Sequence, residues 1–286
     1  MRIHRGGPAA AGLALCLGVL AACGGSSDDA SGDPAAPPTV RGTAPQSATG
    51  SEGPRSPEGS PEGSLDGSAL RGKVIVIDPG HNGGNASHPS EINKQVPIGN
   101  GSKECDTSGT STNAGYEEHA FTWDVSNRLA KLLRAGGAKV TLTRKNDTSV
   151  GPCITERAAV GNRLRADAAL SVHADGASAS GHGFHIIEPI GVKGHNTEAV
   201  PASLKLGRNL RDAYRSGTDV PYSNYIGEKG LDRRSDLGGL NLSTVPKVFI
   251  ECGNMRNAGD AGRLSSSSFR QRIAESLAKG FDAYFR

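Results

Sequence analysis

Three residues that could do chemistry stand at the ends of short apolar runs: His81, His173 and Glu251. Two imidazoles and a carboxylate form a common ligand set for a catalytic zinc ion, with one coordination position left for water. Zinc lowers the pKa of that water and polarises a carbonyl, and a second carboxylate then acts as base. The residue types therefore predict metal-assisted hydrolysis, with His81 and His173 as ligands.

The best third ligand is Glu118, because it lies at the start of a helix that we expect to pack on the sheet. Glu251 is then left as the catalytic base, and a carboxylate directly after residues 248–250 is costly unless it is paired or functional. Alternatives remain open. Glutamates at a helix start, Glu117 among them, also complement the helix dipole without binding metal. Reserve ligands are His119, His182, His185 and His195.

Apolar runs and helical periods alternate along residues 71–286, and they must position these groups. The patterns predict strands at 73–78, 139–144, 168–173, 183–188 and 247–251, and helices at 117–134, 155–165, 202–216 and 269–285. Strands alternating with helices indicate the α/β class: a single domain with a mostly parallel twisted sheet flanked by helices. Ligands of such sheets bind beyond the carboxyl ends of the strands, where the two histidines and Glu251 stand.

Residues 82–117 show no helical or strand period long enough for a solid element. Loops longer than about 15 residues inside a compact domain are usually functional or disordered. We expect this one to form a wall of the substrate groove. It contains Cys105, and Cys153 precedes a predicted helix. Both lie in polar, loop-like sequence, so we expect them to pair, whereas Cys252 follows a strand and should be a small buried residue.

The amino-terminal segment has the pattern of an export signal. Arg2 and Arg5 precede an apolar run at 9–20 that is too short to span a bilayer. The stretch Leu20-Ala21-Ala22-Cys23 resembles a bacterial lipobox, in which the cysteine is lipidated. An ordinary signal peptide cut nearby is the alternative. We expect a lipoprotein-type signal peptide at 1–22 and a membrane anchor at Cys23.

A disordered tether is predicted for residues 23–70, followed by a catalytic domain at 71–286. Gly, Ser and Pro make up 25 of the 47 residues from 24 to 70, so little apolar surface offsets the entropy of folding. Of the total charge of +3, Arg2 and Arg5 of the signal contribute +2, and the tether, with seven acids and two arginines, contributes −5, so the folded domain is near +6. The sequence has no basic stripe with interleaved aromatics, so a nucleic-acid partner is unsupported.

The domain resembles the zinc-dependent N-acetylmuramoyl-L-alanine amidases, cell-wall hydrolases of the amidase-3 type. The motifs that carry the likeness are VIVIDPGHNGG around His81, YEEH around Glu118, the helix containing Arg157, LSVHADG around His173, and VPKVFIECGNMRNAGDA around Glu251. Two positions depart from the family pattern. The family usually has lysine where His119 stands, and a Gly-Phe pair where Cys252 and Gly253 stand.

The resemblance implies that His81, Glu118 and His173 bind Zn²⁺ and that Glu251 is catalytic. It implies hydrolysis of the amide between N-acetylmuramic acid and L-alanine in peptidoglycan. We expect a monomer, and the amino-terminal signal places it on the outer face of the cytoplasmic membrane or in the cell wall or periplasm. A non-catalytic peptidoglycan-binding or regulatory module on the same fold is the alternative function. A zinc peptidase acting on another amide is a second one.

Overall fold

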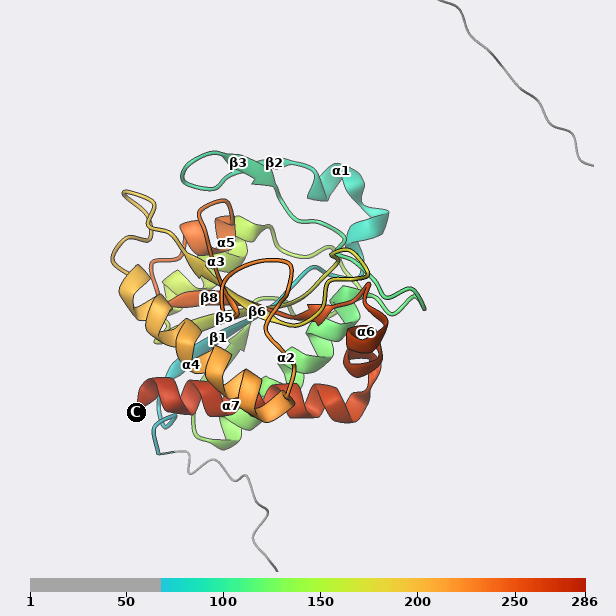
Figure 1. The fold of residues 1–286 in the computed structure, drawn as a ribbon. Coiled ribbons are helices and arrows are strands. Elements are labelled where there is room, and N and C mark those ends of the chain that lie inside the picture. Colours follow the sequence, from blue (N-terminus) through green and yellow to red (C-terminus); the bar gives the residue numbers. More distant parts are fainter. Residues whose placement is uncertain (1–67) are drawn as a thin grey trace, which may run out of the picture. The chain divides into compact units, whose positions relative to one another are not determined.

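The computed structural model describes residues 68–286, which form an α/β domain around a six-stranded sheet (Figure 1). The strands of this sheet are β1 (Val74–Pro79), β4 (Lys139–Leu142), β5 (Ala168–Asp175), β6 (His185–Pro189), β7 (Leu231–Arg234) and β8 (Lys247–Asn254). The larger helices are α2 (Glu118–Ala135), α3 (Ile154–Leu164), α4 (Val200–Thr218) and α7 (Ser267–Phe285), and the shorter ones are α5 (Gly238–Asn241) and α6 (Ala258–Ser265). The predicted fold class is confirmed.

The predicted signal peptide, the lipid-anchor residue Cys23 and nearly all of the predicted tether lie outside the described residues. Leu70, at the end of the predicted tether, is fully buried in the core. Between residues 68 and 286, no helix combines the length and the apolar character needed to cross a bilayer.

The strand order β4-β1-β5-β8-β6-β7 brings the predicted site residues to one edge of the sheet. The first four strands are mutually parallel, whereas β6 runs antiparallel to β8 and β7 runs parallel to β6. Because β1, β5 and β8 are parallel neighbours, their carboxyl ends meet at the same edge. His173 on β5 is the register partner of Glu251 on β8.

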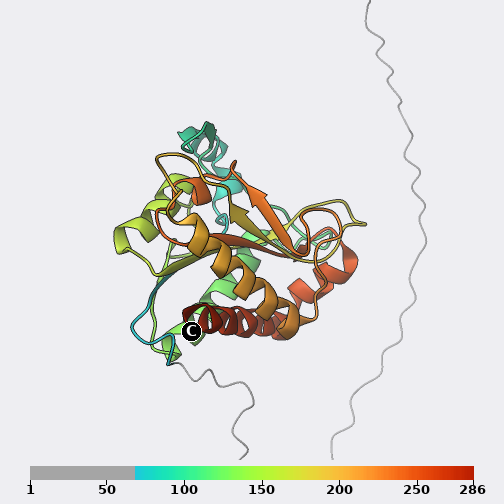
Figure 2. The ribbon, with the colours of Figure 1, turned by 60° about the vertical axis from the view of Figure 1, so that its left-hand side comes forward.

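Helices cover both faces of the sheet. Figure 2 shows α2, α4 and α7 on one side, where they bury the main apolar core. Helix α2 packs there through residues that recur every fourth position and are fully buried: Phe121, Val125, Leu129 and Leu133. The other face carries α3 and α5, which contact β1 and β6.

The segment at 82–117 contains more regular structure than the sequence predicts. It holds the 3-10 turn η1 (Asn85–Ser87), the short helix α1 (Pro89–Ile92) and a hairpin of β2 (Gln95–Pro97) and β3 (Ser102–Glu104). The prediction missed the hairpin because each strand has three residues and mostly exposed side chains, so no apolar alternation marks it. The edge strand β7 was missed because three of its four residues are charged, so it shows no apolar alternation either.

A buried ion cluster joins β1 to the face that carries α3. Asp78 pairs with Arg157 at 3.0 Å and with Lys247 at 3.1 Å, and all three side chains are almost fully buried. The hydroxyls of Ser171 and Thr143 donate to the same carboxylate, each at 2.6 Å. Burial opposes ionisation of Asp78, but Lys247 and Arg157 outweigh it and hold the pKa of Asp78 well below its usual value.

Replacing Asp78 with Asn should destabilise the fold strongly, because it leaves two buried cations without their shared carboxylate. Removing one partner of a buried pair costs about 3–5 kcal/mol in the free energy of unfolding, which urea denaturation would measure. Asp219→Asn, at an exposed aspartate, is the control and should change that free energy by less than about 0.5 kcal/mol. A loss below about 1 kcal/mol for Asp78→Asn would contradict the role of the cluster.

The pH dependence follows from the sign of the shift. The pKa of Asp78 is lower in the folded chain, so its stabilising contribution is complete above the unfolded value of about 4 and is lost as the pH falls toward the folded value. The Asp78→Asn variant should therefore lose less stability than the wild type when the pH is lowered from neutral into the acid range.

Candidate metal centre and active site

His81 lies two residues beyond β1, in a left-handed backbone conformation with φ of 57°. Histidine is among the side chains that tolerate this region, although such strain costs of order 1–3 kcal/mol. The guanidinium of Arg157 donates to the carbonyl of Pro79 at 2.7 Å and to the carbonyl of His81 itself at 2.9 Å. The strained turn is therefore held from both sides by one buried cation.

The ring of His81 is oriented by the loop that follows the hairpin. Its Nδ1 donates to the carbonyl of Thr107 at 3.1 Å and lies 3.5 Å from Asp106. A metal-binding histidine usually donates its second ring N–H to such a carbonyl or carboxylate, which fixes the tautomer. The other nitrogen, Nε2, lies 3.1 Å from the Oε2 atom of Glu118.

Glu118, the first residue of α2, reaches both imidazoles. Its Oε1 atom lies 3.0 Å from Nδ1 of His173, and the carboxylate also accepts from the backbone N–H groups of Thr110 and Ala174. Glu118 is 4% exposed, whereas Glu117 is an exposed residue that precedes the helix. The geometry therefore selects Glu118 between the two glutamates that the sequence left open.

His173 is held between two rings and a glycine. Its imidazole stacks on Phe249 with centroids 5.3 Å apart and meets the ring of His81 edge-on at 4.9 Å. A Cβ atom at Gly80 would lie 2.2 Å from the His173 ring. Glycine is thus needed at position 80, because any side chain there would displace the imidazole.

The charges of this cluster are strongly coupled. Burial opposes protonation of His81, but Glu118 and Asp106 outweigh it and raise the pKa of His81 to about 10. Burial likewise opposes ionisation of Glu118, yet the two imidazoles hold the pKa of its carboxyl well below the usual range. A cation is favoured between these groups, and a metal ion that binds there at neutral pH must displace a proton from His81.

Among residues 68–286, His81, Glu118 and His173 form the one group whose ligand atoms could hold a metal, and these atoms lie within 4.8 Å of one another. Two imidazole nitrogens and one carboxylate oxygen suit zinc at a site that keeps an open position. Two of the reserve ligands have other neighbours. His119 bonds to Asp147 at 2.8 Å, and His185 lies on β6 beside Tyr225.

Glu251 lies on β8 between the register partners His173 on β5 and His185 on β6. Its Oε2 atom is buried and has no hydrogen-bond partner among the described residues. Burial raises the pKa of Glu251 well above its ordinary value, and the negative charges of Glu118 and Asp175 add to the effect. An unpaired buried carboxylate next to three potential ligands is typical of a catalytic group.

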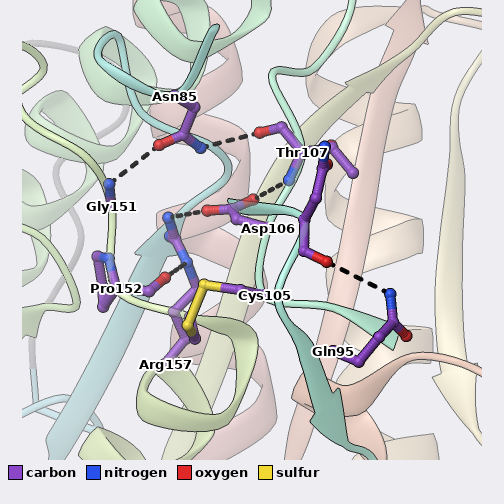
Figure 3. Close-up of a disulfide and its surroundings, with 10 residues drawn as sticks. Asn85, Gln95, Cys105, Asp106, Thr107, Gly151, Pro152 and Arg157 are labelled. Atoms are coloured by element: carbon purple, nitrogen blue, oxygen red, sulfur yellow. Dashed lines mark hydrogen bonds and ion pairs between the residues drawn. A yellow bond between two sulfur atoms is a disulfide. The ribbon is translucent and has the colours of Figure 1, made fainter. Parts of the chain in front are cut away.

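The predicted disulfide between Cys105 and Cys153 is confirmed, and Cys252 is a buried free thiol. Figure 3 shows the bridge beside Asp106 and Arg157, whose side chains form an ion pair at 2.9 Å. The bridge therefore fastens the loop that orients His81 to the start of α3.

Comparison with known proteins identifies the family of this chain. The family model for N-acetylmuramoyl-L-alanine amidase matches residues 75–283. The chain belongs to this family. N-acetylmuramoyl-L-alanine amidase Rv3717 of Mycobacterium tuberculosis is 44% identical over 215 residues, which cover 74% of this chain and 86% of that protein.

Two solved amidase structures share the fold at substantial identity. Ami1 from Mycobacterium smegmatis matches with a TM-score of 0.71 and 39% identity, covering 76% of this chain and 98% of that one. The apo form of Ami1 from Mycobacterium abscessus matches with a TM-score of 0.70 and 41% identity, covering 76% and 100%. The family resemblance predicted from the motifs is confirmed.

Sequence reasoning missed the residues that support the ligands. Asp106 and Thr107 orient His81, and Arg157 holds its backbone. One signal was available, because Arg157 stands beside Ala158 on the buried face of an amphipathic helix. A charge on an apolar helix face is costly without partners. The loop residues Asp106 and Thr107 carried no comparable signal.

Breaking the disulfide should weaken substrate binding more than it weakens metal binding. Lys103, Asp106 and Thr107 line a cavity that also borders His81 and His173, so freeing this loop should loosen one wall. We expect the double variant Cys105→Ser, Cys153→Ser to show a raised KM and faster proteolysis within 82–117, with unchanged metal content by mass spectrometry. Unchanged kinetics after the bridge is lost would refute the wall role.

Proposed function

We propose that this chain hydrolyses the amide bond between N-acetylmuramic acid and L-alanine in peptidoglycan, using a zinc ion held by His81, Glu118 and His173. The observation that carries the proposal is the convergence of these three ligand atoms beside Glu251, in a chain of the amidase family. The relatives that cover most of the domain are named as amidases for this bond, which supports the same substrate here.

Zinc bound at this site would supply Lewis-acid polarisation of a carbonyl and of water. The chain's own residues do the rest. The N–H of His81 donates to Thr107 and so keeps Nε2 directed at the site. The hydrogen bonds from Thr110 and Ala174 keep both oxygens of Glu118 in position.

Glu251 moves the proton. Its carboxylate takes a proton from the attacking water as the new C–O bond forms. It then delivers this proton to the nitrogen of the leaving L-alanine, and the C–N bond breaks. A raised pKa suits a group that must hold a proton between these two events. The leaving amine must therefore lie on the Glu251 side of the site.

Glu251→Gln should keep the metal and lose turnover, because the amide cannot carry the proton. General acid–base catalysis is worth about 10²–10⁴-fold in rate, so dye release from purified cell wall should fall by that factor.

His173→Ala should lose the metal as well as the activity, and a chelator should abolish wild-type activity. Full metal retention in His173→Ala would refute the ligand set. Wall binding without dye release by the wild type would favour a non-catalytic module.

We also propose that the protein is exported and anchored to the outer face of the membrane through a lipid on Cys23. The basic residues Arg2 and Arg5, the short apolar run and the lipobox-like Leu20-Ala21-Ala22-Cys23 support this placement, as does a substrate that lies outside the cytoplasm. In the native host, Cys23→Ser should move the protein from the membrane fraction to the soluble exported fraction. Equal membrane retention would contradict the anchor.

A further inference from the structure

The edge of the sheet opposite to the candidate site carries a cluster of positive charge. Strand β1 starts at this edge and ends at the site, and its six residues span about 20 Å at about 3.3 Å each. Asp167, Asp282 and the terminal carboxylate of the chain lie in this region, but the cations outnumber them. The cations, which we call the basic pole, are Arg71, Lys73, Lys131, Arg134, Lys139, Lys205 and Arg286.

Contacts between four elements bring the basic pole together. The backbone N–H of Lys139, at the start of β4, donates to the carbonyl of Lys73 at 2.7 Å. The Nζ atom of Lys73 lies 5.1 Å from the ring centroid of Phe285, near the end of α7. The Nζ atom of Lys205 on α4 donates to the carbonyl of Tyr284 at 3.0 Å. Figure 1 shows the carboxyl terminus and the start of β1 on the side of the domain away from the β2–β3 hairpin.

Several cations of the basic pole are free to meet a partner. Arg71, Lys131 and Lys139 are exposed and have no ion-pair partner among residues 68–286. Near the site, by contrast, Arg234 binds Asp236 at 2.7 Å. Exposed cations without an acid beside them keep their full charge for an anionic partner.

The entry of the chain into the domain favours a membrane as that partner. Arg71 and Lys73 belong to the segment that leads into β1, and the residues before this segment include Cys23, the proposed lipid-anchor residue. An anchor attached through this edge brings the basic pole, rather than the site, to the bilayer. We propose that the basic pole docks on anionic phospholipid headgroups and turns the active site away from the bilayer. The direction of attachment rests on the proposed anchor, whereas the charge does not.

The range of electrostatic attraction restricts which residues take part. Each Lys or Arg close to an anionic bilayer strengthens binding about fivefold, and the attraction fades within a Debye length of about 8 Å at physiological ionic strength. Cations at the site edge, about 20 Å away, therefore add little. A single acyl chain holds a protein only reversibly, and a basic patch is a second signal that makes anchoring stable.

The test measures sedimentation of the mature chain, residues 23–286, with vesicles. Cys23→Ser removes the lipid, so that only the protein surface contributes. The vesicles contain either phosphatidylcholine alone or phosphatidylcholine with phosphatidylglycerol, which is anionic. We expect binding to the anionic vesicles alone, and its loss as the ionic strength rises from about 0.01 M to about 1 M. Equal binding to both kinds of vesicle would overturn the proposal.

Neutralising part of the basic pole should weaken this binding about a hundredfold, at about fivefold for each cation. The variant combines Arg71→Gln, Lys131→Gln and Lys139→Gln. The matched control makes the same change in net charge at three exposed lysines nearer the site edge, with Lys94→Gln, Lys145→Gln and Lys229→Gln. It should lose less than about threefold. Equal losses in the two variants, both folded by circular dichroism, would overturn the proposal.

Energy transfer from tryptophan to a dansyl-labelled lipid reports the orientation without any turnover. The chain has one tryptophan, Trp123, which lies near the site end of α2, about 17 Å along the helix from Arg134 at about 1.5 Å per residue. Phe285→Trp in a Trp123→Phe background places the donor in the basic pole instead. Transfer should be stronger from residue 285 than from residue 123, and the reverse order would overturn the orientation.

Vesicle binding decides this proposal separately from the proposed function. Binding through the basic pole would stand even if the chain hydrolysed no cell wall. An active amidase that ignored anionic vesicles would refute the docking surface alone. Retention of the Cys23→Ser chain on purified anionic wall polymer, lost in the basic-pole variant and without any vesicle binding, would overturn membrane docking in favour of a wall contact.

Discussion

The geometry of the site depends on the buried guanidinium of Arg157. It forms ion pairs with Asp78 and Asp106 and donates to the carbonyls of Pro79 and His81. A buried cation is tolerated only when its donors are satisfied, so α3, β1 and the loop after the hairpin must meet in one arrangement. That arrangement sets the left-handed turn at His81 and the loop that orients its ring.

Successive side chains of a strand point to opposite faces of the sheet, so one face builds the core and the other carries the site residues. On β5, Leu170 and Val172 point into the core, whereas Ser171 and His173 point to the opposite face. The same alternation on β8 buries Ile250 and leaves Glu251 beside the site. On the face that carries the ligands, the hydroxyl of Ser171 donates to the carboxylate of Asp78. The apolar core can therefore be dense without constraining which residues do chemistry.

The two departures from the family pattern have local structural roles. His119, where the family usually has lysine, pairs with Asp147, and Asp147 also binds the buried Arg144. Beyond Glu251, Cys252 packs into the core, and the side-chain amide of Asn254 donates to the carbonyls of Ser178 and Gly181. These bonds fix the loop after β5, which lies near the amine side of the proposed site.

The sequence by itself determined the α/β class, five of the six strands of the main sheet, the cysteine pair and the residue types of the candidate centre. These follow from local patterns, because apolar periodicity and turn residues act within a few positions. It favoured Glu118 as the third ligand but kept Glu117 as an alternative, and it gave no sign of the hairpin, of β7 or of Asp106 as a partner of His81. Only the tertiary structure decided these points. Helix α2 turns one glutamate inward and leaves the other exposed, and the contacts of Asp106 join residues 25 to 51 positions apart. The cavity that borders His81 and His173 likewise forms only where β8, α3, α5 and the hairpin meet, and no local pattern records such a meeting.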